Sequence, residues 1–256
     1  MNNKLIAFER LLNIMDDLRE KCPWDKKQTF ETLRKLTIEE TYELSDAIHD
    51  NDLEEIKKEL GDLFLHLVFY SKLGSEVQAF DVADVLNGVC EKLIIRHPHI
   101  YGDVKAEDDE AVKRNWEKIK LAEGNKSVLG GVPKSLPAMN KAQRIQEKVK
   151  GVGFDWDDKT QVWTKVEEEI AEFKAVENTN SEEAEKELGD IFFSLINYAR
   201  FLGIDPETAL EKTNRKFIDR FQLLETLIKA DKKDITELNL NEMDVYWERA
   251  KKQVSN

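Results

Sequence analysis

The sequence predicts an all-α protein made of two tandem helical modules, and three observations support this fold class. The chain has only 11 glycines and 5 prolines in 256 residues, so few positions interrupt a helix. Apolar residues recur at helical spacing along most of the chain, for example at Leu60, Leu63 and Leu67. The pentapeptide KELGD occurs at 58–62 and again, unchanged, at 186–190, a displacement of 128 residues. A repeat at half the chain length indicates two diverged copies of one helical unit.

Turn-forming residues place the helix starts and the division between the modules. The aspartate–proline pair at 205–206 and Ser181, which two glutamates follow, are typical helix starts. The middle of the chain concentrates helix breakers, namely Gly124, Gly130, Gly131, Pro133 and Pro137. We therefore expect an N-terminal module at 1–123, a linker at 124–137 and a C-terminal module at 138–256, each a domain of the four-helix-bundle type.

The composition restricts the partners of the protein. The formal net charge of −13 argues against holding nucleic acid through a general basic field, so a polyanionic substrate would need a cation or a few placed basic side chains. Cys22 and Cys90 form no metal-binding or disulfide framework, which fits reduced thiols in the cytoplasm. Residues 1–12 contain no apolar signal core, and the longest apolar stretch, at 63–70, is far shorter than the roughly 20 residues of a membrane span. We expect a cytoplasmic protein without membrane or direct nucleic-acid contacts.

Acidic residues occur in two patterns in each half of the chain. An EExxE pattern at 39–43 precedes the first KELGD segment, and a second one at 168–172 precedes the other. One EExxE pattern alone is more often a solvated helix face than a site. Here, however, Glu43 and Glu59 lie equally far from the polar turn at residue 51, and the second half repeats this symmetry. In an antiparallel helical hairpin, equal distance from the turn means equal height, so the acidic pairs of the two helices lie level.

Four carboxylates that converge beside an apolar seam repel one another and favour a bound cation. The spacing i, i+3 keeps the two acids of each helix on one face. Oxygen ligands without His or Cys favour Mg²⁺, with Mn²⁺ as an alternative, and Mg²⁺ commonly binds together with phosphate. The acids concerned are Glu40, Glu43, Glu59 and Asp62 in the first half and Glu169, Glu172, Glu187 and Asp190 in the second.

Basic and aromatic residues further along each half fit a phosphate-containing ligand. Lys216 and Arg220 lie one helical turn apart, as do Lys92 and Arg96, and such pairs can hold phosphate oxygens. Each pair is equally compatible with an ordinary helix surface. Two tryptophan–lysine pairs, Trp247 with Lys251 and Trp116 with Lys120, offer a stacking face and a cation, although a helical tryptophan is as often part of the core.

Taken together, these segments resemble the MazG nucleoside triphosphate pyrophosphohydrolases of the all-α NTP pyrophosphatase superfamily, in their tandem-module form. The segments are CPWD at 22–25, EETYE at 39–43, ELGD at 59–62, RHPHIYGD at 96–103, GVP at 131–133 and VGFDW at 152–156. The resemblance covers nearly the whole chain, departing at Phe30 and Gly130. It implies Mg²⁺-dependent hydrolysis of NTPs and dNTPs to the monophosphate and pyrophosphate, which cleans the nucleotide pool, by a homodimer.

The resemblance also assigns roles to residues and favours the C-terminal module as the one that hydrolyses NTPs. It implies four residues that are both catalytic and metal-binding: Glu169, Glu172, Glu187 and Asp190. The implied nucleotide and phosphate contacts are Lys165, Glu168, Lys186, Lys216, Arg220, Trp247 and Lys251. The N-terminal counterparts, a second site of the same kind, are Glu40, Glu43, Glu59, Asp62, Lys92, Arg96, Trp116 and Lys120.

Two other classes of protein compete with this hydrolase. A ferritin-like iron bundle needs Glu-x-x-His on two helices, and no histidine here has a glutamate three residues before it. A helical regulatory or scaffold protein could bind nucleotide and metal without turnover. The products formed from NTP and Mg²⁺ distinguish the three classes.

Overall fold

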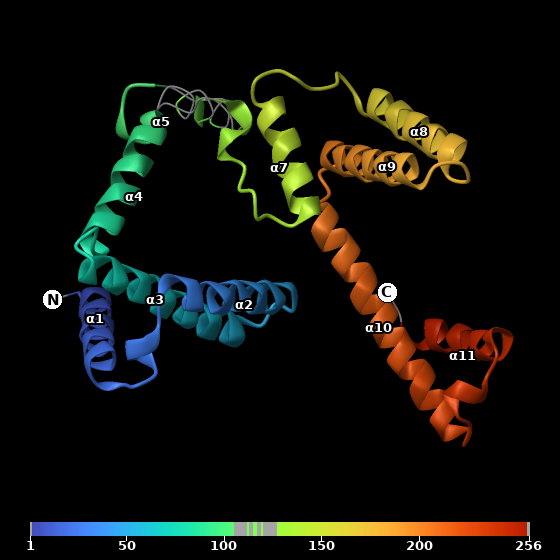
Figure 1. Cartoon of the computed structure of the whole chain (residues 1–256), viewed down its shortest axis with the longest axis horizontal. Helices are drawn as coiled ribbons and strands as arrows, with labels where there is room; N and C mark the ends of the chain where they lie inside the picture. Colours follow the sequence, from blue (N-terminus) through green and yellow to red (C-terminus); the bar gives the residue numbers. More distant parts are fainter. Residues whose placement is uncertain (1, 105–111, 113–114, 117–118, 120–126, 255–256) are drawn as a thin grey trace. The chain divides into compact units, whose positions relative to one another are not determined.

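The computed structural model describes residues 2–104, 112, 115–116, 119 and 127–254, and all regular structure within them is helical (Figure 1). The all-α prediction is confirmed. The chain divides into two compact units, Met1–Ala106 and Glu107–Asn256. This division falls before the expected linker at 124–137, of which the structure describes the part from Ser127 onward, and the exact module limits stay a prediction.

The first unit is an antiparallel hairpin of two long helices with shorter helices around it. Its elements are α1 (Asn3–Lys21), η1 (Asp25–Lys27), α2 (Phe30–His49), α3 (Leu53–Glu76), α4 (Val82–Arg96) and α5 (Pro98–Tyr101). Asn51 turns the chain between α2 and α3 with a φ of 55°, a left-handed conformation that asparagine tolerates. Asp52 then caps α3 by accepting hydrogen bonds from the backbone of Glu54 and Glu55. This short capped turn sets the register of the hairpin.

The core of the first unit joins three helices. Met15 from α1 and Leu33 from α2 pack with Val68, Phe69 and Leu73 from α3, and all five are buried. Because three of these residues come from the C-terminal half of α3, the core lies at the end of the hairpin away from the turn. The other end of the hairpin carries the acidic residues.

The second unit repeats the hairpin and adds a further helix pair. Its elements are η2 (Val128–Gly131), α7 (Ala138–Lys150), α8 (Lys159–Val176), α9 (Ser181–Phe201), α10 (Pro206–Ala230), η3 (Ile235–Glu237) and α11 (Leu240–Gln253). The two helix starts expected at Ser181 and Pro206 are confirmed. Asn180 and Asp205 cap these helices by accepting hydrogen bonds from backbone N–H groups.

Packing in the second unit has two centres. Leu224 and Ile228 of α10 form a buried cluster with Tyr246 and Ala250 of α11. The hairpin is packed separately, with buried aliphatic residues on both of its helices: Val162, Val166 and Ile196. The hairpin that carries the acidic residues therefore has its own packing, distinct from the α10–α11 cluster.

Both units expose large apolar side chains. On α4 no side chain in the described residues is buried, and the exposed ones include Val85, Leu86, Val89, Leu93 and Ile94. The hairpin helices α3 and α9 expose Phe64, Leu67, Phe192 and Leu195, and α10 exposes Leu210, Phe217, Ile218 and Phe221. Several large exposed apolar side chains on one helix are typical of an interaction face. None of the described helices combines the length and apolar character needed to cross a membrane.

Candidate metal centre and adjoining cavity

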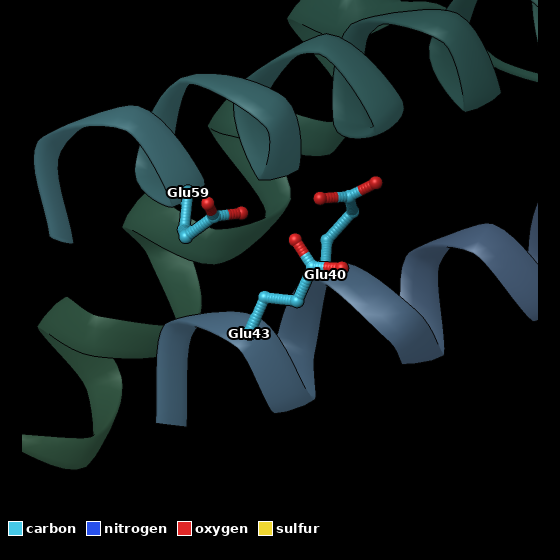
Figure 2. Close-up of side chains that lie close together, drawn as sticks. All are labelled: Glu40, Glu43 and Glu59. Atoms are coloured by element: carbon cyan, nitrogen blue, oxygen red, sulfur yellow. The ribbon is translucent and has the colours of Figure 1, made fainter. Parts of the chain in front are cut away.

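Each helical hairpin brings three carboxylates to one point. In the first unit they are Glu40 and Glu43 of α2 with Glu59 of α3, and Figure 2 shows these side chains facing one another across the hairpin. In the second unit they are Glu169 of α8 with Glu187 and Asp190 of α9. Within each trio, one oxygen from each residue lies within 4.8 Å of the others. The register deduced from the turn thus places acids of the two helices level with each other.

Glu59 provides the clearest test of whether a cation fits the first trio. Its side chain is 1% exposed, and its Oε1 accepts a hydrogen bond from Lys58 Nζ at 3.0 Å. Its Oε2 is buried and has no hydrogen-bond partner in the described part of the chain. A buried carboxylate oxygen without a donor is costly, and a hard divalent cation would supply the missing partner. The residues therefore fit Mg²⁺ or Mn²⁺.

Like-charge repulsion is visible in the electrostatics of both clusters. Burial, followed by repulsion from Asp62 and Glu43, raises the pKa of Glu40 above its ordinary value. In the second unit, desolvation and then repulsion from Glu169 raise the pKa of Glu172. Asp62 and Glu172, which complete the two predicted quartets, therefore act electrostatically on their trios.

One lysine accompanies the second cluster. Lys165 Nζ lies 2.6 Å from Glu169 Oε1 and 2.8 Å from Glu168 Oε1, and these hydrogen bonds raise the pKa of Lys165. Glu169 is buried. Because the trio has three carboxylates, one lysine compensates only part of its negative charge. Lys186, in contrast, pairs with Glu182 and Glu183 at 3.4 and 3.6 Å.

The remaining predicted nucleotide contacts lie on other helices. Trp247 of α11 packs on Phe217 of α10, with ring centroids 5.1 Å apart, and Lys251 pairs with Glu248 on its own helix. Lys216 and Arg220 also lie on α10, so these four residues belong to the α10–α11 pair. In the first unit Lys92 and Arg96 lie on α4. Trp116 is half-buried, and Lys120 lies outside the described residues.

A cavity of about 460 Å³ adjoins the second cluster, and sequence analysis did not predict it. Glu169, Asp190 and Lys165 form part of its wall. The apolar lining comes from Ile145, Val149, Phe154, Trp156, Val162 and Phe193, and the other polar lining from Gln146, Asp155, Ser194, Asn197 and Arg200. A volume of this size is ordinary for a small-molecule site. A sequence signal for this cavity was the polar pair Asn197 and Arg200, one helical turn apart on α9.

Two of these cavity positions correspond to residues of the packed core in the first unit. The repeat displacement of 128 residues matches Asn197 with Phe69, which is 2% exposed and part of the core. On α8 and α2 the two halves are offset by 129 residues, so Lys165 corresponds to Leu36, which packs against that core. The two halves therefore share the carboxylates but differ in what lies beside them.

The fold and the acidic trios define the class of this protein: an all-α chain with a duplicated acidic helical hairpin. The family model of the MazG nucleotide pyrophosphohydrolase domain matches it at residues 28–101 and 159–223, one segment in each half. The chain belongs to this MazG family.

Curated relatives agree with this assignment. The chain is 44% identical over 251 residues to the nucleoside triphosphate pyrophosphohydrolase/pyrophosphatase MazG of Thermotoga maritima, covering 96% of both chains. It is 41% identical to the nucleoside triphosphate pyrophosphohydrolase of Escherichia coli K12, covering 96% of this chain and 97% of the relative. The protein of the same name from Mycobacterium tuberculosis is 33% identical over 154 residues, 57% of this chain and 46% of the relative.

The raised pKa of Glu172 predicts how the metal-free protein responds to pH. The pKa of this carboxyl group is higher in the folded state than in the unfolded state, so it stabilises the fold at pH values below its unfolded-state pKa. This stabilisation is lost as the pH rises through the folded-state pKa. We therefore expect Glu172→Gln to raise the midpoint of thermal unfolding in EDTA at pH 7, with a smaller effect at pH 4. Mn²⁺ should stabilise the variant less than the original protein.

The matched control for this prediction is Glu185→Gln, which removes the same charge from an exposed position on α9. An equal change in midpoint for both variants at pH 7 would assign the effect to net charge and contradict the role of the cluster.

Proposed function

We propose that this chain hydrolyses nucleoside and deoxynucleoside triphosphates to the monophosphate and pyrophosphate, with Mg²⁺ or Mn²⁺ as cofactor. The observation that carries the proposal is the second carboxylate trio, of which Glu169 and Asp190 line the 460 Å³ cavity. A cation site beside a cavity with apolar walls suits a ligand that is polyanionic at one end and apolar at the other. The names of the relatives in Thermotoga maritima and Escherichia coli support the same activity.

In this proposal, the second cluster holds the cation through Glu169, Glu172, Glu187 and Asp190. When bound, Mg²⁺ neutralises charge on the triphosphate and supports attack by water without a covalent nucleophile. Lys165, which already lies against Glu169, provides a fixed positive charge beside the phosphates. Glu168 orients Lys165, while Lys186, Lys216, Arg220, Trp247 and Lys251 are further proposed nucleotide contacts. We place this activity in the cytoplasm, which the two free cysteines support.

The products test the activity. With Mg²⁺ and several NTPs, we expect equal amounts of pyrophosphate and monophosphate, and no turnover in EDTA. Chromatography of the nucleotides together with separate assays for pyrophosphate and orthophosphate measures this. Orthophosphate with a diphosphate product would contradict the proposal, and nucleotide binding without either product would identify a regulatory or scaffold protein instead.

We assign the activity to the second hairpin, because the matching positions of the first are filled by Phe69 and Leu36. Glu172→Ala and Glu187→Ala should lower kcat by at least about 100-fold, since loss of a ligand exceeds the 10–100-fold effect of losing a group that supports one. The first-half variants Glu43→Ala and Glu59→Ala are the matched controls and should retain substantial activity. Circular dichroism must show all four variants folded. Equal losses in both halves would mean that the active site is in the first module or is shared.

We also propose that the protein is a homodimer in which a second copy covers exposed apolar faces such as those of Phe64 and Phe192. Two antiparallel hairpins packed together complete a four-helix bundle. Sedimentation equilibrium at micromolar concentration should give twice the chain mass of 29.7 kDa. Phe192→Asp should shift this equilibrium toward the monomer, whereas a wild-type mass near 30 kDa would refute the proposal.

A further inference from the structure

An ion pair between Arg200 and Asp155 joins the hairpin of the second unit to the loop that precedes it. Arg200 lies in the last turn of α9, and Asp155 lies in the loop between α7 and α8, 45 positions earlier in the chain. Arg200 Nη1 donates to Asp155 Oδ2 at 2.9 Å, and Nη2 donates to Asp155 Oδ1 as well. The two side chains are only 11% and 18% exposed. A two-pronged and largely buried pair of this kind holds its partners more firmly than an exposed pair does.

Arg200 is itself fixed by its own helix. Its Nε and Nη2 atoms donate to Asn197 Oδ1, one turn earlier on α9, at 3.0 and 2.7 Å. Its guanidinium group lies over the ring of Phe201, 4.6 Å from the ring centroid. Because these contacts already orient the guanidinium group, little side-chain freedom is lost when it pairs with Asp155. The loop is therefore tied to a fixed point on α9.

The loop at 151–158 has no regular secondary structure. Gly153 within it has a φ of 87°, a left-handed conformation that glycine adopts without strain, and glycine leaves a loop many alternative conformations. The N–H of Phe154 donates to the carbonyl oxygen of Val149 on α7 at 3.0 Å, which ties the loop to the helix before it. The ion pair, in contrast, ties the loop to α9, a helix that comes much later in the chain.

The loop also supplies part of the wall of the 460 Å³ cavity. Phe154 and Trp156 line this cavity together with Glu169 and Asp190 of the second trio. The two aromatic residues are 78% and 46% exposed, so packing against the rest of the protein holds them only weakly. Their place in the cavity wall therefore depends on what anchors the loop, and the pair between Asp155 and α9 is such an anchor.

We infer that Arg200 and Asp155 are positioning residues, which hold the loop where Phe154 and Trp156 contact the bound substrate. The inference rests on the proposed function, in which a nucleoside triphosphate occupies the cavity. The two aromatic side chains offer apolar contact and take no part in the attack of water on phosphorus, so they bind the substrate and the transition state equally well. Loss of the ion pair should therefore raise KM and leave kcat nearly unchanged.

Three variants test this role: Arg200→Met, Asp155→Ala and the double variant that carries both changes. With ATP and Mg²⁺, we expect each single variant to raise KM by about 10-fold, the usual effect of losing a charged hydrogen bond, with kcat within about twofold of the original. Because both substitutions remove the same contact, the double variant should be no worse than either single variant. If Arg200 instead bound the phosphates directly, Arg200→Met would lower kcat and Asp155→Ala would not raise KM, and this result would overturn the inference.

The matched control is Arg19→Met, because Arg19 makes the same kind of pair in the first unit. Its Nε and Nη2 atoms donate to the two carboxylate oxygens of Glu76 at 2.8 and 2.9 Å, and its side chain is 16% exposed. This variant should lower the midpoint of thermal unfolding about as much as Arg200→Met does, but it should leave KM within about twofold. An equal rise of KM in the control would assign the effect to general loosening of the fold and contradict the positioning role.

Two measurements report the loop without turnover. Backbone hydrogen exchange over 151–158 should be faster in Arg200→Met and in Asp155→Ala than in the original protein, and unchanged in Arg19→Met. Calorimetric titration with the α,β-imido analogue of ATP and Mg²⁺ should show affinity reduced about 10-fold in the same two variants. Unchanged exchange or unchanged affinity would overturn the inference. Both changes in a protein that releases no pyrophosphate would overturn the proposed function alone, and failure of the original protein to bind the analogue would overturn both.

Discussion

Repulsion among carboxylates that the hairpins bring together is the constraint on which the site depends. The capped turns fix the register, and this register places acids of α2 beside those of α3, and acids of α8 beside those of α9. The electrostatic cost appears in the raised pKa of Glu40 and Glu172. Both halves contain this repulsion, so a hard cation that binds between the carboxylates would stabilise the folded state.

The two halves use the same hairpin for different purposes. In the first, Phe69 and Leu33 are part of the buried core at the end of the hairpin opposite the turn. In the second, Asn197 and Val162 occupy the matching positions and line a cavity. A large aromatic side chain stabilises by filling volume, whereas a site needs that volume to remain open. Duplication allows one copy to supply packing while the other carries a cavity next to its carboxylate trio.

The sequence could predict what depends on spacing and could not predict what depends on packing. Helical period, helix starts and the level placement of Glu43 and Glu59 follow from counting residues along a hairpin, and the structure shows these two acids together with Glu40. The cavity follows from how α7 packs on α9, and Gln146 has no counterpart in the repeat motifs that would indicate it. The relation of Trp247 and Lys251 to the cluster likewise depends on how helices dock, which spacing does not determine. Their predicted role in nucleotide binding stays a prediction.

Lys165 lies between the second carboxylate trio and the adjoining cavity. It pairs with buried Glu169, and it lines the 460 Å³ cavity beside the second trio. Its raised pKa keeps it positively charged, so it remains a cation throughout the neutral pH range. When a divalent ion takes up the charge of Glu169, the attraction between Glu169 and Lys165 weakens, and the exposed Glu168 is left as its remaining partner. The ammonium group of Lys165 has three N–H donors, of which Glu168 and Glu169 take two, so the third is available for a phosphate oxygen. A cation held by Glu169 would leave more of the positive charge of Lys165 to the phosphates, so that binding of the cation and binding of the nucleotide would assist each other through this side chain.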